Sequence, residues 1–163
     1  MVFLRRKWIW LAIGLPILIF AWLAFRPEKL WINQRVNEPT PFASSSGARP
    51  IFVGRLEGRA HPTRGQATIY ESIGGKRYLR LTDFTTSNGP DVQVVLARAE
   101  DPAVEQKIVK GNLDYVELGK LKGNQGDQNY EVPVAVDLQK YNAVVIYCVR
   151  FSAVFGVARE ESP

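Results

Sequence analysis

The stretch QATIYESIGGKRYLRLT, residues 66–82, decides the fold class of this chain. Apolar and polar side chains alternate on both sides of Gly74 and Gly75, as they do in strands that bury one face. The two glycines supply the left-handed backbone conformations that a tight hairpin turn needs. The stretch therefore predicts an antiparallel hairpin with strands at 66–72 and 77–82.

The same kind of pattern continues on both sides of this hairpin. From Ile51 onward, short alternating or apolar runs are separated by turn residues. The later runs predict strands at 91–97, 114–120, 128–132, 142–151 and 153–158, with one helical turn or an irregular connection at 103–109. We therefore expect an all-β domain, a β-sandwich of about eight short antiparallel strands.

An uncharged stretch, WIWLAIGLPILIFAWLAF, occupies residues 8–25. At a rise of about 1.5 Å per residue it spans roughly 27 Å, just enough for the hydrocarbon core of a bilayer. Its tryptophans lie near the ends, where aromatic side chains meet the lipid headgroups. Its length, and Trp22 where a cleavage site would need a small residue, favour an uncleaved transmembrane helix over a signal peptide.

The charges that flank this helix predict its orientation. Three basic residues at 5–7 precede it, whereas Arg26 and Lys29 follow it with Glu28 between them. This bias places residues 1–7 in the cytoplasm and the domain outside it, in the periplasm or at the cell surface. Membrane lipid is then the partner of the N-terminal helix.

The remaining chain divides into a linker and one domain. Residues 26–50 hold four prolines and a Ser-Ser-Ser-Gly run, which predicts a linker, so the domain is expected at 51–163. Residues 1–49 carry seven of the 21 Lys and Arg residues and two of the 16 Asp and Glu residues. The rest of the chain is therefore neutral, which argues against nucleic acid as a partner.

Cys148 is the only cysteine, and it lies in the apolar run NAVVIYCVRF at 142–151. Oxidising compartments favour paired cysteines, so an unpaired one outside the cytoplasm is informative. It is either a small buried apolar residue or a redox thiol, a metal or haem ligand, or half of an intermolecular disulfide. Arg150 would stabilise a thiolate if the two side chains shared a pocket.

His61 is the only histidine, in a turn-rich segment before the first alternating strand. It is either a solvated loop residue or a ligand and proton carrier. A zinc site usually needs three or four side-chain ligands, which Cys148 and His61 alone do not supply. Haem needs only one or two axial ligands and stays open as a cofactor, with Cys148 and His61 as the candidates.

Two polar loops supply candidate ligand-binding residues. One holds Asp83, Asn88 and Asp91 beside a tight turn, and the other holds Asp127 in the segment 122–130. These residues either stabilise turns or bind a ligand, and Asp83, Asp91 and Asp127 would form a calcium site if the loops converged. No nucleophile elbow or phosphate-binding glycine loop is present in the sequence.

An ordered set of segments resembles the DM-thirteen domain family, an extracytoplasmic module of bacteria and of animal cell-surface proteins. The matching pieces run from Gly54 to Ala158 and are Gly58…His61…GQATIY at 65–70, LRLTDF at 79–84, NGPDV at 88–92, YVELGKLKGN at 115–124, GDQNY at 126–130, and VVIYC…F…VFG…A at 144–158. Each piece alone is weak, but the ordered set is specific.

The resemblance implies a β-sandwich and a single cysteine that has been proposed to act in electron transfer, in some proposals through bound haem. Cys148 occupies the position of that cysteine, and His61 that of a histidine often seen in the family. This chain carries the domain alone, so an electron donor or acceptor must be another protein or a small molecule.

The leading hypothesis is a membrane-anchored redox or cofactor-binding domain centred on Cys148. A redox thiol should be accessible, with a lowered pKa, and a haem ligand should face an apolar pocket. The alternative is a non-catalytic binding module, with exposed polar and aromatic residues at 88–91 and 123–130. The third hypothesis is a structural spacer, in which neither the loops nor the cysteine bind anything.

Overall fold

The computed structural model describes residues 14–16, 32–42 and 47–161, and the chain divides into two units, one up to Ile32 and one from Asn33 onward. Gly14, Leu15 and Pro16 are helical. The rest of the transmembrane helix predicted at 8–25 lies outside the described residues. Within the described part of the chain, no helix is long and apolar enough to cross a membrane.

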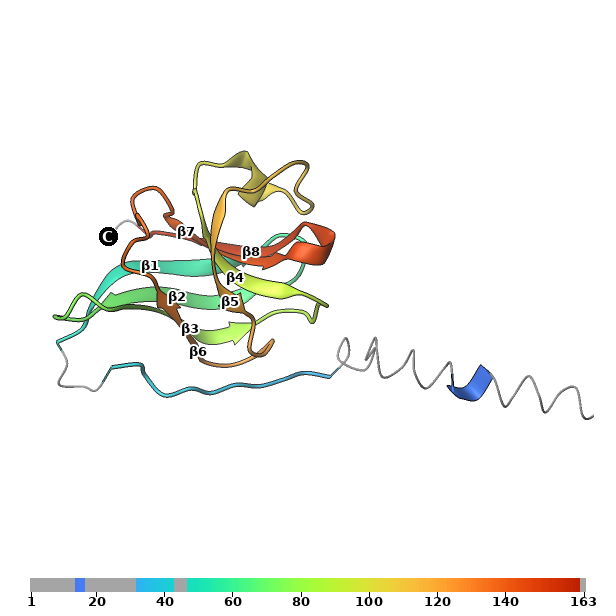
Figure 1. Cartoon of the computed structure of the whole chain (residues 1–163), viewed down its shortest axis with the longest axis horizontal. Helices are drawn as coiled ribbons and strands as arrows, with labels where there is room; N and C mark the ends of the chain where they lie inside the picture. The colour runs from blue at the N-terminus through green and yellow to red at the C-terminus, as the bar shows by residue number, and fades with distance from the viewer. Residues whose placement is uncertain (1–13, 17–31, 43–46, 162–163) are drawn as a thin grey trace, which may run out of the picture. The chain divides into compact units, whose positions relative to one another are not determined.

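Eight antiparallel strands within the described residues form a sheet in the order β5-β4-β7-β8-β1-β2-β3-β6 (Figure 1). The strands are β1 Arg49–Gly58, β2 Arg64–Glu71, β3 Arg77–Thr85, β4 Val92–Ala97, β5 Tyr115–Lys120, β6 Gln128–Val132, β7 Ala143–Cys148 and β8 Ala153–Arg159, with 3₁₀ turns η2 at Pro102–Glu105 and η3 at Val149–Phe151. The predicted all-β chain of about eight strands is confirmed, and the hairpin at 66–82 is β2–β3. The strand predicted at 142–151 stops at Cys148, because the chain turns into η3.

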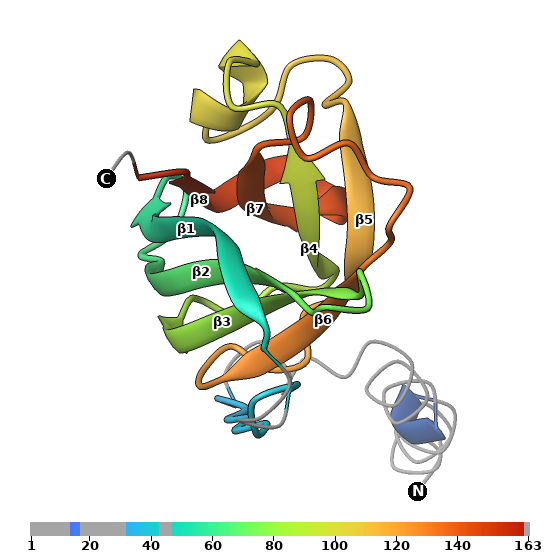
Figure 2. The ribbon, with the colours of Figure 1, turned by 90° about the vertical axis from the view of Figure 1, so that its left-hand side faces the viewer.

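Strand β1 joins the two halves of the sheet. Its first part pairs with β2, whereas Leu56, Glu57 and Gly58 pair with β8. The sheet curls until its edge strands β5 and β6 come into contact (Figure 2). The result is one nearly closed sheet, barrel-like or sandwich-like, so the two expected layers are halves of a single sheet.

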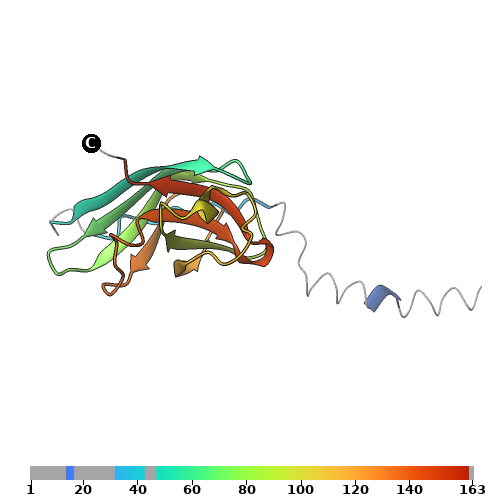
Figure 3. The same ribbon diagram turned by 90° about the horizontal axis from the view of Figure 1, so that it is seen from above.

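The core has two parts. An interior cluster lies between the two halves of the sheet and includes Leu79, Ile146 and Cys148. A second cluster lies on the outer side of β4, β7 and β8, where the segment that contains η2 covers the sheet (Figure 3). Because β4 and β7 are buried on both faces, their sequences do not alternate: β7 is apolar throughout, and β4 is apolar at every position except Gln93.

Residues 33–39, called the strap below, lie against the barrel although the sequence predicted a linker at 26–50. The N–H of Val36 donates to the carbonyl of Gln125 and the N–H of Glu38 to that of Asp127, both at 2.9 Å. The carboxylate of Glu38 accepts from Lys122 Nζ at 2.7 Å. The compact unit therefore begins at Asn33, ahead of the domain start expected at residue 51.

A close approach between β2 and β3 requires Gly65, where the register of the two strands shifts. Its φ is +127°, and a Cβ there would lie 2.8 Å from both the Cα of Phe84 and the carbonyl oxygen of Thr82. We expect Gly65→Ala to lower the free energy of unfolding by about 3 kcal/mol, measured by denaturant titration.

Gly74→Ala is the matched control, because a Cβ on Gly74 meets only Ser72 Oγ at 3.9 Å. The control should change stability by less than about 0.5 kcal/mol. Equal effects of the two substitutions would contradict the role assigned to Gly65.

Candidate functional site

The register of the sheet places all six sequence-predicted candidate residues at one end of the barrel. Strands β1, β3, β5 and β7 end there, and β2, β4, β6 and β8 begin there. The loops at this end are 59–63, 86–91, 121–127 and 149–152, and we call it the Cys148 end. It holds His61, Asp83, Asn88, Asp91, Asp127 and Cys148.

Cys148 itself is enclosed. It is the last residue of β7, lies opposite Val92 of β4 and Ala153 of β8, and is 0% exposed within the interior cluster. Arg150, the expected thiolate partner, is exposed in η3. The accessible thiol that a redox role requires is therefore covered in this structure.

The ring of Phe155 connects the loops at this end to the interior. His61 is half-buried, and its ring centroid lies 4.0 Å from that of Phe155, a buried residue of the cluster that contains Cys148. Gly89 lies against the same ring, because a Cβ there would be 3.0 Å from Phe155 Cζ. Phe155 is thus a site residue that the sequence pattern gave no reason to single out.

The surroundings of Cys148 do not fit a haem ligated by its sulfur. The interior of an eight-stranded barrel is either filled by side chains or holds one small ligand, and here Cys148 is 0% exposed among the apolar side chains of the interior cluster. Three surface hollows of the described residues measure about 360, 430 and 450 Å³, and neither Cys148 nor His61 lines any of them. None of these three hollows is the apolar pocket expected beside a haem ligand.

Asp83 and Asp127 lie in contact, and their hydrogen bonds stabilise the fold. The N–H of Asp83 donates to Asp127 Oδ1 at 3.1 Å, and Asp127 Oδ2 accepts from Arg80 at 2.7 Å. Arg80 is only 8% exposed and also donates to the strap carbonyls of Glu38 and Pro39. Asp127 therefore balances a buried cation that holds the strap.

The four predicted ligand-binding residues do not line one common hollow among those described. A hollow of about 430 Å³ contains Asp83 and Asp127 in its lining but neither Asn88 nor Asp91. Asp91 lies beside η3, where its carbonyl accepts from the N–H of Val149 at 3.0 Å. Across the described residues, no three His, Cys, Asp or Glu side chains come close enough to hold a metal ion. The three aspartates of the calcium hypothesis, Asp83, Asp91 and Asp127, are therefore not brought together in the part of the chain that the structure describes.

The loop at 123–130, expected to be exposed, is largely buried. Asn124 is 4% exposed, Gln128 0% and Tyr130 4%. Gln128 Oε1 accepts from the N–H of Lys122 and the hydroxyl of Tyr130, and burial raises the pKa of Tyr130 to about 12. The expected cluster of exposed polar and aromatic residues is therefore wrong for this loop.

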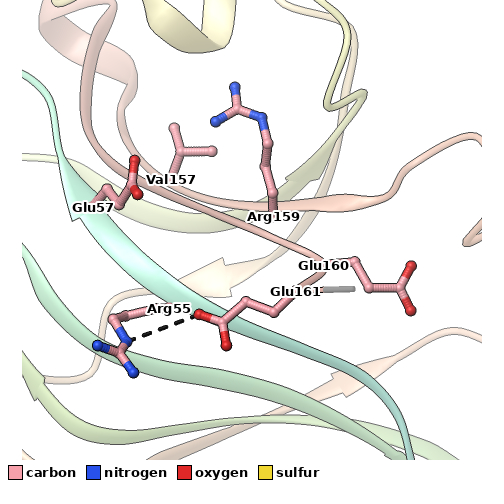
Figure 4. A pocket seen from close by; sticks show the side chains of 6 residues that line it. All are labelled: Arg55, Glu57, Val157, Arg159, Glu160 and Glu161. Atoms are coloured by element: carbon pink, nitrogen blue, oxygen red, sulfur yellow. Dashed lines mark ion pairs between the residues drawn. The ribbon is translucent and has the colours of Figure 1, made fainter. Parts of the chain in front are cut away.

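A hollow of about 360 Å³ lies where β1 meets β8, and its charged side chains are shown in Figure 4. Arg55 Nε lies 3.8 Å from a carboxylate oxygen of Glu161, and Arg159 pairs with Glu105 of η2. Exposed pairs of this kind contribute about 0–1 kcal/mol each. We assign this seam no ligand.

The geometry defines a class of protein: a nearly closed all-β domain with one enclosed cysteine beneath its loops. A family model described as "Electron transfer DM13" matches residues 55–159, more than half of the chain. The chain belongs to this family, which indicates a redox-related function. The match begins inside β1 and ends with β8, so the strap lies outside it. No curated protein and no solved structure matched the chain.

The assignment of Asp127 to structure is testable. Asp127→Ala leaves the buried Arg80 without its carboxylate, and we expect a loss of about 2–3 kcal/mol in the free energy of unfolding. Asp83→Asn is the control, because Asp83 is exposed and Asn tolerates its left-handed φ of +49°. Denaturant titration that finds a larger loss in the free energy of unfolding for Asp83→Asn than for Asp127→Ala would contradict the assignment.

Proposed function

We propose that this protein is a membrane-anchored electron-transfer domain that works outside the cytoplasm, with Cys148 as its redox centre. The N-terminal helix at 8–25 holds it in the membrane. The observation that carries the proposal is the convergence of the lone cysteine, His61 and four loops at one end of a domain of an electron-transfer family.

Reaction at Cys148 requires the cover over its sulfur to open locally. Cys148 directly precedes η3, and Ser152 caps the C-terminus of η3 with a left-handed φ of +48°. That conformation costs a non-glycine residue about 1–2 kcal/mol, so we propose η3 as the weakest part of the cover. Two backbone hydrogen bonds hold the turn closed. The N–H of Val149 donates to the carbonyl of Asp91, and the N–H of Val109 donates to the carbonyl of Ser152.

Once exposed, Cys148 exchanges with a disulfide of a partner protein. Its thiol loses a proton to water, its Sγ bonds to one partner sulfur, and the partner's S–S bond breaks to release the other sulfur as a thiolate. Because the chain has no second cysteine, another thiol from a partner must resolve the mixed disulfide. The proposed partner is therefore a redox protein that carries a disulfide or dithiol.

The test is the reaction of the purified full chain with glutathione disulfide in a series of urea concentrations below those that unfold the chain. Mass spectrometry measures the rate of adduct formation at each concentration. We expect one glutathione adduct in the native chain and none in Cys148→Ala. Local opening of η3 exposes little surface, so the rate of adduct formation should be nearly independent of urea. A rate that rises with urea as steeply as global unfolding would contradict the proposal.

A non-catalytic binding module is the second candidate. It is favoured by two hollows of about 430 and 450 Å³ that share Arg64 and Thr85 in their linings at the Cys148 end. This function needs no thiol, so Cys148→Ala would leave partner binding intact, whereas Arg64→Ala would weaken it.

A further inference from the structure

The domain has two points at which it could receive the chain from the membrane, and they lie at opposite ends of the barrel. Strand β1 begins at Arg49, which pairs with Glu71 at the end away from Cys148. The compact unit, however, begins at Asn33. The side-chain oxygen of Asn33 accepts from the side chain of Asn124, in a loop of the Cys148 end, at 2.8 Å.

The strap connects these two ends. The N–H of Gln34 donates to Asn124 Oδ1 at 2.7 Å, and the chain then runs along β6 until Phe42 packs against Tyr78, with ring centroids 5.3 Å apart. Figure 1 shows this segment, in blue and cyan, running from the end of the barrel where β3 ends toward the β2–β3 hairpin. The docked strap therefore moves the entry point of the chain from the far end to the Cys148 end.

We propose that the docked strap turns the Cys148 end toward the membrane, so that the redox partner is a protein embedded in the membrane or bound to its surface. This inference rests on the proposed membrane anchor. From the predicted helix end at residue 25, eight residues reach Asn33 and span at most about 28 Å. An undocked chain would enter at Arg49 through 24 residues, with a reach of about 84 Å.

Two glycines of the barrel make room for the strap. A Cβ on Gly123 would overlap the carbonyl oxygen of Gln34, and a Cβ on Gly126 would overlap that of Val36. Both glycines belong to the loop that receives the strap through a short parallel pairing of Arg35 with Gln125. The barrel surface is thus shaped for this segment at the points of closest approach.

Side-chain contacts of Glu38 reinforce the backbone pairing. Its carboxylate accepts from Lys122 Nζ and, at 2.7 Å, from the N–H of Asn129. Burial raises the pKa of Glu38, but these hydrogen bonds and the charges of Lys122 and Arg80 outweigh it and hold the pKa below its ordinary value. The ionised carboxylate therefore stays in place at neutral pH.

The test places a fluorescent label on the full chain in phospholipid vesicles that carry a quencher attached to lipid headgroups. In a Cys148→Ala background, Arg150→Cys labels the Cys148 end and Ile73→Cys, where the native side chain is 87% exposed, labels the far hairpin. We expect stronger quenching at position 150 than at position 73, so that the ratio of quenching at position 150 to quenching at position 73 is above one.

The strap is released by the double substitution Val36→Pro and Glu38→Pro, which removes both N–H groups that bond to the barrel. Both positions lie outside the matched region of the family, so the barrel should still fold. The ratio should fall to one or below. Asn37→Pro is the matched control and should keep the ratio, because among the described residues the N–H of Asn37 donates to no group.

The outcomes separate the two proposals. Wild-type chain that fails to float with the vesicles would refute the membrane anchor, and the orientation with it. Chain that floats but is quenched equally at both positions, or more at position 73, would refute the orientation alone. An unchanged ratio in the released variant would also overturn the proposal, because the strap would not be what orients the domain.

Discussion

The change of partner along β1 determines how the sheet closes. By pairing first with β2 and then with β8, one strand joins two four-stranded halves into a nearly closed sheet with a shared interior. Because the strands are antiparallel throughout, alternate connections must lie at opposite ends of the barrel. That rule alone brings residues 61, 88, 127 and 148 to one end, although they are far apart in the sequence.

The polar residues at the Cys148 end have two separate uses. Those of the loop at 121–127, together with Arg80, satisfy buried groups and attach the strap. The loops that carry His61 and Gly89 instead cover Phe155 and, through it, the interior beside Cys148. The enclosed Cys148 therefore lies beneath loops that are separate from the contacts of the strap.

The sequence predicted the hairpin strands well, because alternation and the Gly74-Gly75 turn are local signals. It extended β7 too far, since an apolar run does not reveal the left-handed φ of Ser152. The burial of Cys148 was left open for a related reason: β7 is buried on both faces, so alternation could not show which face met the interior. The strap escaped prediction because the prolines and serines of the segment 26–50 around it are typical of linkers, whereas its attachment depends on glycines and a carboxylate almost 90 residues away.

We propose that the sulfur of Cys148, and not a cofactor bound to it, carries the redox chemistry, because Cys148 is 0% exposed within the interior cluster. The most direct test is the visible absorption spectrum of the full chain purified from cells supplied with haem, before and after dithionite, beside Cys148→Ala. We expect no Soret band in either protein. A Soret band that shifts on reduction and disappears in Cys148→Ala would contradict this proposal.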